Sequence, residues 1–194
     1  MIADHLGRRF IGFDSKKRID GALHLASNRG TTRFRGKTTM SFRVTGLSPQ
    51  AFLHLYGLSD DALAAVGIRR MVADEKPGFP DRVELRDADP GERLLLLNYT
   101  HQPADNPYRA SHAIFVLEGA TRAYDRTDEI PQALRVRTLS LRAFDRNDLM
   151  VDADIIDGRQ VEDLIERLFA DSAVAYVHAH YAKRGCYAGR IDRA

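Results

Sequence analysis

The sequence predicts an α+β fold: a mainly antiparallel sheet with two short N-terminal helices and one longer amphipathic helix near the C-terminus. Three observations support this prediction. Short apolar runs of strand length recur between turn-forming segments rich in Gly, Pro, Asn and Asp. Residues 159–170 alone have the clear period of an amphipathic helix. Strands and helices do not alternate as a doubly wound parallel sheet would require.

Length and composition indicate a single globular domain. A chain of 194 residues with 44% hydrophobic residues can bury a substantial core. No apolar run approaches the roughly 18 residues of a membrane helix, and the N-terminus lacks the apolar segment of a signal peptide. We therefore expect a cytoplasmic protein with no membrane partner. The single cysteine, Cys186, excludes an intrachain disulfide and zinc sites built from several thiolates.

Charge divides the chain into two parts. Residues 1–39 contain nine of the 29 Lys and Arg but three of the 27 Asp and Glu. They show no sustained hydrophobic period, so we expect 1–39 to be a basic, mobile N-terminal arm with a short strand near residues 10–13, and 40–194 to be one α+β domain. Because Met40 is followed at once by a strand-like segment, one hypothesis is that translation starts there and that the arm is not native. The widely spaced aromatic residues of the arm disfavour nucleic-acid binding.

The N-terminal half of the domain begins with two capped helices. Ser48 followed by Pro49 is a typical helix start. Ser59, with two aspartates after it, begins a second short helix that Gly67 ends. Strands are expected at 68–74 and at 82–86, where the second alternates apolar and charged residues as a half-exposed strand does.

The C-terminal half contains the stronger patterns. Two apolar runs, 94–97 and 113–117, bracket a polar insert on which a rigid sheet would present chemistry. Residues 136–144 and 149–156 are expected to form two antiparallel strands joined by a tight turn. The helix at 159–170 follows, with Asp157 as its N-cap. Strands over 173–181 and 187–191 complete the fold.

Several sequence blocks of the domain also resemble those of a known family. These blocks are residues 77–82 (PGFPDR), 91–99 (GERLLLLNY), 107–115 (PYRASHAIF), 177–180 (VHAH) and 186–191 (CYAGRI). Together they resemble a bacterial family called domain of unknown function 1203, over about residues 41–193. The resemblance implies a single-domain bacterial protein and no assigned activity. Many members have cysteines where Asp81 and Gly189 stand and Gly-Pro at His112-Ala113, so the resemblance implies no thiol-rich metal or redox site here.

Two histidines, His178 and His180, are candidate ligands of a divalent metal. They stand two apart on a predicted strand, so both imidazoles leave the same face. Two ring nitrogens at this spacing can reach one ion, and His101, His112 or Cys186 would complete a site. The alternative is that both rings are hydrogen-bonded on a half-buried sheet face.

The cysteine is a candidate nucleophile. Cys186 follows Lys183 and Arg184, and nearby cations stabilise the reactive thiolate. A histidine such as His112 would serve as the base. The alternative is an inert, buried thiol. Asp152 and Asp154 share one strand face as magnesium ligands would, although ion pairs with Arg135 or Arg137 explain them more simply.

The polar insert supplies groups that bind anions. Arg109 offers a planar fork for a carboxylate or phosphate, unless it pairs with Asp105 to hold the loop. Our first hypothesis is a protein that binds a small anionic molecule in a pocket of histidine, arginine, tyrosine and serine side chains. The residues expected to line that pocket are Tyr99, His101, Arg109, Ser111, His112, His178 and Arg190.

Two other classes of function stay open at this point. An enzyme would use the same pocket, either with a metal on His178 and His180 or with Cys186 as nucleophile. A non-catalytic interaction protein, including a homodimer formed through an uncovered sheet edge, would need no pocket at all. The chain lacks G-x-G-x-x-G, Walker, H-E-x-x-H and G-x-S-x-G motifs, which disfavours nucleotide binding and the common hydrolase mechanisms.

Overall fold

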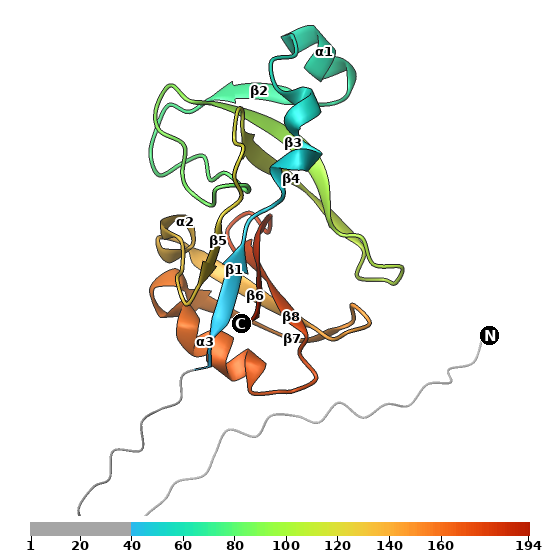
Figure 1. Cartoon of the computed structure of the whole chain (residues 1–194), viewed down its shortest axis with the longest axis vertical. Helices are drawn as coiled ribbons and strands as arrows, with labels where there is room; N and C mark the ends of the chain where they lie inside the picture. The colour runs from blue at the N-terminus through green and yellow to red at the C-terminus, as the bar shows by residue number, and fades with distance from the viewer. Residues whose placement is uncertain (1–39) are drawn as a thin grey trace, which may run out of the picture. The chain divides into compact units, whose positions relative to one another are not determined.

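The computed structural model describes residues 40–194, in which two antiparallel sheets form the body of the protein (Figure 1). The predicted arm, 1–39, and its short strand lie outside the described residues. The broad prediction is confirmed, although the fold is mostly β. The larger sheet has the order β5 (Asp125–Thr127), β1 (Phe42–Thr45), β9 (Tyr187–Arg193), β8 (Tyr176–Tyr181), β6 (Thr138–Phe144) and β7 (Met150–Asp157). The smaller sheet has the order β2 (Arg69–Val72), β3 (Arg93–Gln102) and β4 (Ala110–Leu117).

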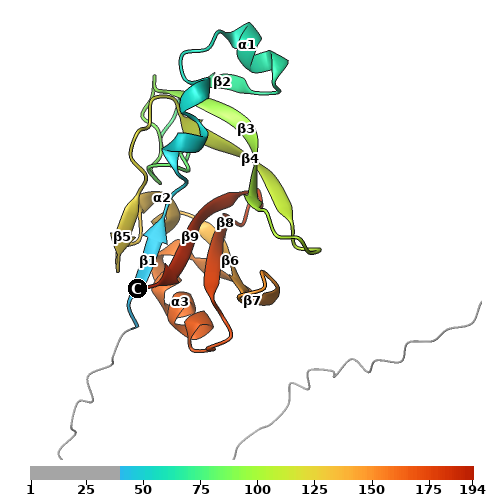
Figure 2. The same cartoon turned by 45° about the vertical axis from the view of Figure 1, so that its right-hand side comes forward.

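The larger sheet is covered on one face by the predicted C-terminal helix (Figure 2). A 3-10 turn, Gly158–Gln160, leads into α3, Val161–Phe169. The Asp157 carboxylate accepts a hydrogen bond from the Arg159 backbone N–H, as expected of an N-cap. The five apolar residues that predicted the helix are all buried against the sheet: Val161, Leu164, Ile165, Leu168 and Phe169. A shorter helix, α2 (Gln132–Arg135), and strand β5 were not predicted.

The smaller sheet has its own core, closed by the N-terminal helical segments. The first predicted helix is two consecutive 3-10 turns, Pro49–Ala51 and Leu53–Leu55. The second is α1, Asp60–Ala65, whose N-cap Ser59 accepts a hydrogen bond from the Ala62 backbone N–H. Both segments contribute apolar side chains to the core of β3 and β4.

The segment that joins the two cores was predicted as a half-exposed strand over 82–86, and this prediction is wrong. Residues 82–86 belong to no strand, and the two isolated bridges nearby, Pro80 with Asp87 and Asp81 with Phe115, lie just outside them. Its alternating apolar residues are both buried, but in different cores: Val83 lies with β3 and β4, whereas Leu85 packs into the core of the larger sheet. Leu85 has a φ of 51°, a left-handed conformation that turns the backbone between them.

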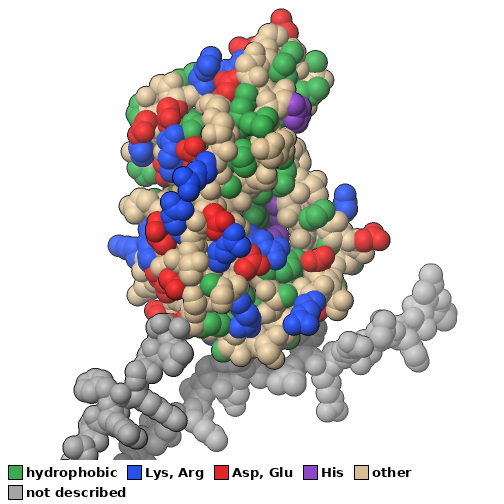
Figure 3. All heavy atoms as spheres, in the orientation of Figure 1, with side chains coloured by type: hydrophobic (Ala, Val, Ile, Leu, Met, Phe, Trp, Pro, Cys, Tyr) green, Lys and Arg blue, Asp and Glu red, His purple; other side chains and the backbone are tan. Residues whose placement is uncertain are grey.

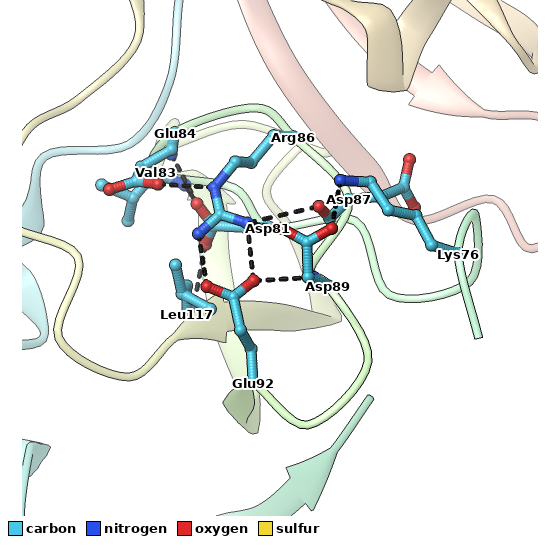
Figure 4. A network of polar contacts seen from close by, with 9 residues as sticks. All are labelled: Lys76, Asp81, Val83, Glu84, Arg86, Asp87, Asp89, Glu92 and Leu117. Carbon is cyan, nitrogen blue, oxygen red and sulfur yellow. Dashed lines mark hydrogen bonds and ion pairs between the residues drawn. The ribbon is translucent and has the colours of Figure 1, made fainter. Parts of the chain in front are cut away.

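A paired set of charges holds this segment in place (Figure 4). We call it the Arg86 network; its charged members are Lys76, Asp81, Glu84, Arg86, Asp87, Asp89 and Glu92. Arg86 donates to Glu84 and to both carboxylate oxygens of Glu92. Asp81 is fully buried and accepts from the backbone N–H groups of Val83, Glu84 and Leu117, which ties the segment to β4.

A second group of charges lies on the outer strand β7. Arg167 of α3 donates to Asp152 and Asp154, so neither aspartate pairs with Arg135 or Arg137 as predicted. Arg137 instead pairs with Asp87. The two aspartates are therefore explained as surface ion pairs.

None of the helices within residues 40–194 has the length and apolar character of a membrane-spanning helix.

Candidate functional site: a histidine cluster between the two sheets

Four histidines from the two sheets meet where β3 and β4 approach β8. His101 lies on β3, His112 on β4, and His178 and His180 on β8. We call them the histidine cluster. The His101 ring stacks on His112 with centroids 4.9 Å apart, and it meets His180 edge-on at 5.1 Å and His178 edge-on at 5.6 Å. Histidine side chains are visible in a recess near the middle of the face in Figure 3.

A β-bulge directs His101 into the cluster. Thr100 pairs with Ser111 and Gln102 pairs with Ala110, so His101 is an extra residue with no partner on β4. Consecutive strand residues normally point to opposite faces, yet His101 and Gln102 are both buried. Bulges often re-aim a side chain next to a functional site. Gln102 then donates to the Tyr176 hydroxyl at 2.7 Å, which fastens the end of β3 to β8.

A second bulge brings the Tyr187 ring against the histidine cluster. His180 pairs with Tyr187 and Ala179 pairs with Gly189, so Ala188 has no residue opposite it on β8. Tyr187 is buried and its ring stacks on His101 at 4.8 Å. On β8 itself the period of two holds, since the rings of His178 and His180 have centroids 6.4 Å apart and both meet the Tyr187 ring edge-on.

The hydrogen bonds of the cluster leave ring nitrogens unused. His180 Nδ1 lies 3.0 Å from the Gly185 carbonyl oxygen. A carbonyl only accepts, so Nδ1 carries the proton and His180 Nε2 carries the lone pair. His112 Nδ1 lies 2.9 Å from His101 Nε2. His180 Nε2, His101 Nδ1 and His178 Nδ1 are buried and have no hydrogen-bond partner among the described residues.

Burial and mutual repulsion keep these imidazoles neutral. Desolvation, followed by the charges of His112 and Arg142, lowers the pKa of His101 to about 4. Burial is also the largest cause for the others, with the pKa of His178 lowered to about 2, that of His180 to about 3, and that of His112 lowered as well. At neutral pH the cluster therefore presents uncharged nitrogen donors.

Three of the four histidines have the geometry of metal ligands. One ring nitrogen from each of His101, His112 and His180 lies within 4.8 Å of the other two. His178 borders this group of three and is not part of it. His180, one of the two sequence candidates, is thus grouped with two histidines that had been named as completing ligands. The cluster can hold a cation that prefers neutral nitrogen donors.

The residues expected to form an anion pocket do not come together. Tyr99 packs on Phe52 in the core of the smaller sheet, and the Ser111 hydroxyl shares a hydrogen bond with Thr100 on an exposed face. Arg109 is exposed and donates to the Pro103 carbonyl, not to Asp105. Arg190 pairs with Asp192 and lies over the Tyr176 ring. Only the histidines of that set share a site.

Cys186 lies close to a cation that sequence reasoning did not single out. Arg82, only 2% exposed, donates from Nη2 to Cys186 Sγ at 3.1 Å and from Nε to the Tyr187 carbonyl at 2.9 Å. Tyr187 and Arg82 were both missed as site residues. The one signal for them was that each lies within a block of the resembled family.

Comparison with known proteins agrees with the expectation from those blocks. The family of proteins of unknown function DUF1203 matches residues 78–193. The chain belongs to the DUF1203 family. The DUF1203 match includes all four histidines of the cluster and the whole Arg86 network except Lys76. No curated protein and no solved structure matches the chain.

Proposed function

We propose that this protein binds one divalent transition metal ion through His101, His112 and His180. The observation that carries the proposal is the close approach of three ring nitrogens in a buried site, within 4.8 Å of one another. The lone-pair nitrogen of one ligand residue, His180 Nε2, is also buried without a partner among the described residues. A buried polar atom without a partner costs free energy, and coordination would remove that cost.

The environment of His180 supports a role as a metal ligand. Metal-bound imidazoles usually donate their second N–H to a carbonyl or carboxylate, which fixes the ring and its tautomer. The Gly185 carbonyl does this for His180 through Nδ1 at 3.0 Å. The free lone pair is therefore on Nε2, within the cluster.

The contact between His101 and His112 also fits a shared ion. With metal–nitrogen distances of about 2.1 Å, two ligands on one ion lie about 3.0 to 3.4 Å apart. His101 Nε2 and His112 Nδ1 are 2.9 Å apart. In the metal-free protein a proton lies between these nitrogens, and an ion bound there would shift it to the other nitrogen of the same ring.

The donor set favours zinc, iron, nickel or copper over magnesium or calcium. Imidazole suits the former ions, whereas the latter prefer oxygen ligands. Three protein ligands leave at least one coordination position for water or a ligand, as in catalytic zinc sites. The proposed metal site takes the place of the anion pocket that was our first hypothesis. It differs from the metal site expected from the sequence, because His101 and His112 replace His178 as partners of His180.

Metal analysis of the full chain tests this proposal. Protein purified without chelators is measured by plasma mass spectrometry, and metal-free protein is titrated with Zn²⁺ against a chromophoric chelator. We expect about one ion per chain in the wild type. His112→Gln, chosen because His112 is the least buried ligand, should lose it. His54→Gln is the matched control, since His54 is exposed and far from the cluster in the sequence, and it should keep the ion. A His112→Gln protein that binds as tightly as the control would contradict the proposal.

A further inference from the structure

A second site adjoins the histidine cluster. A cavity of about 710 Å³ lies between the segment at residues 78–82, strands β3 and β4, and the turn that joins β8 to β9. This volume lies within the usual range of about 300 to 1,000 Å³ for small-molecule pockets. His112 lines the cavity and also belongs to the proposed metal ligands.

Positive charge dominates the wall of the cavity. Four cationic side chains line it, namely Arg82, Arg137, Lys183 and Arg184, and no aspartate or glutamate of residues 40–194 does. Of the four, Arg137 alone has a carboxylate partner within the described residues, Asp87. An excess of one sign of charge in a cleft raises the local concentration of ligands of the opposite sign.

Among these cations, Arg82 gives the strongest indication of an anion site. Its side chain is almost fully buried, and the partners it meets are two backbone carbonyls, Pro80 and Tyr187, and the Cys186 sulfur. A buried charge without an opposite charge is costly, and an anion in the adjoining cavity would offset that cost.

An unused hydrogen-bond donor lies on the same wall. Tyr181 lines the cavity and is 5% exposed, and its hydroxyl oxygen is buried with no partner among the described residues. The guanidinium carbons of Arg82 and Arg137 lie 5.0 Å and 5.1 Å from the centre of its ring. Burial raises the pKa of Tyr181 to about 12, so the hydroxyl is a neutral donor on a ring that contacts two cations.

Another part of the wall is apolar. Leu96, Phe115 and Val136 line it, and Val136 is 47% exposed. We propose that this cavity binds a small organic anion, in which a carboxylate or phosphate group is carried on an apolar body. Arg82, Lys183, Arg184 and the Tyr181 hydroxyl bind the acidic group, and the apolar residues contact the body.

The two sites are linked through His112, but the anion site does not depend on the metal. If both are present, His112 would hold the metal and also line the anion site, so the anion would lie beside the metal centre. For this last clause alone, the inference rests on the proposed function. Binding of the anion to metal-free protein is expected in either case.

Isothermal titration calorimetry of the full chain with benzoate and phenyl phosphate tests the proposal, in chelator-treated and in Zn²⁺-loaded protein. Benzyl alcohol serves as the neutral analogue. We expect at least one of the two anions to bind and the alcohol to bind about tenfold more weakly or not at all. Absence of binding by both anions, or equal binding by the alcohol, would overturn the proposal.

Two variants locate the site. Tyr181→Phe removes a hydroxyl that has no partner, so the fold should be unaffected while affinity for the anion falls several-fold. Lys183→Gln with Arg184→Gln should weaken binding by about tenfold. The matched control is Arg122→Gln with Arg146→Gln, which removes the same charge from exposed positions that do not line the cavity. An equal loss in this control would show attraction to the surface charge alone and would overturn the proposal.

The outcomes separate the two proposals. Anion binding by a chain that takes up no metal would support the cavity and contradict the metal centre. A chain that takes up metal but binds neither anion would do the reverse.

Discussion

The Arg86 network and the histidine cluster are both polar groups that hold the chain between its two cores, but they differ in how their hydrogen bonds are completed. Each carboxylate of the Arg86 network accepts at least one hydrogen bond (Figure 4). The histidine cluster has three buried ring nitrogens without a partner among residues 40–194. A completed network stabilises the fold, whereas an incomplete one is what a ligand site requires in the absence of its ligand.

The largest expected effect follows from removing one carboxylate of the Arg86 network. Asp81→Ala removes the acceptor of three backbone N–H groups, those of Val83, Glu84 and Leu117. Buried donors without partners cost about 1 to 3 kcal/mol each, so the free energy of unfolding should fall by about 3 kcal/mol or more. Urea denaturation measures this. Asp89→Asn, at an exposed site of the same network, should cost less than about 0.5 kcal/mol. Similar losses in both variants would contradict the structural role assigned to the network.

Completing the cluster with a metal should stabilise the fold by a similar amount. At free Zn²⁺ about 100 times its dissociation constant, binding to the native state contributes about 2.7 kcal/mol. For a chain of this length the expected rise in Tm is about 5 to 10 °C. Differential scanning calorimetry should show the rise in wild type and in His54→Gln but not in His112→Gln. A rise in all three would place the ion elsewhere.

A low pH should destabilise the fold through the histidine cluster, whereas a bound metal should stabilise it. The folded-state pKa values of His101 and His180 are lowered from 6.5 to about 4 and about 3, so below pH 6.5 the unfolded chain binds protons that the native chain does not. Stability of the metal-free protein should therefore fall as the pH drops from about 6.5 to about 4. Urea midpoints at pH 7.5, 5.5 and 4.5 measure this. In His101→Gln the fall should be smaller, and an identical profile would show that other groups cause it.

The smallest expected effect concerns Arg142, a cation whose charge acts on the histidine cluster. Arg142 is half-buried without a hydrogen bond to the described residues, and after burial its charge is a cause of the lowered pKa of all four histidines. Arg142→Gln should raise these pKa values modestly and tighten Zn²⁺ binding a few-fold, because one repulsive charge is removed. Histidine ring NMR titration and the chelator competition assay measure the two changes. Weaker metal binding in this variant would show that Arg142 supports the site.

The parts of the fold that sequence predicted are those determined by local pattern. Helix α3 follows from the spacing of five apolar residues, whereas the predicted N-cap, Asp157, caps the 3-10 turn that precedes the helix. The shared face of His178 and His180 follows from the period of a regular strand. Val83 and Leu85 alternate as strand residues do, but the reason is burial in two separate cores, which only tertiary packing determines.

The site itself depends on two irregularities that have no local signal. The bulges at His101 and Ala188 break the strand period at the two places where the cluster forms. Arg190 and Arg109, which the sequence favoured as anion ligands, satisfy their guanidinium groups locally with Asp192 and Pro103. Arg82 stands where a strand was expected, and its burial near Cys186 comes from packing between distant segments. The residue types of the site were therefore predictable, but their grouping was not.

The most direct test of the claim that the histidine cluster binds a metal is a crystal structure of the Zn²⁺-loaded protein. Diffraction data are collected on both sides of the zinc absorption edge. The account predicts one strong anomalous peak at about 2.0 to 2.2 Å from a ring nitrogen of each of His101, His112 and His180. A fully loaded crystal whose peak lies elsewhere, with water or a protein group bonded to the free nitrogens of the cluster, would contradict it.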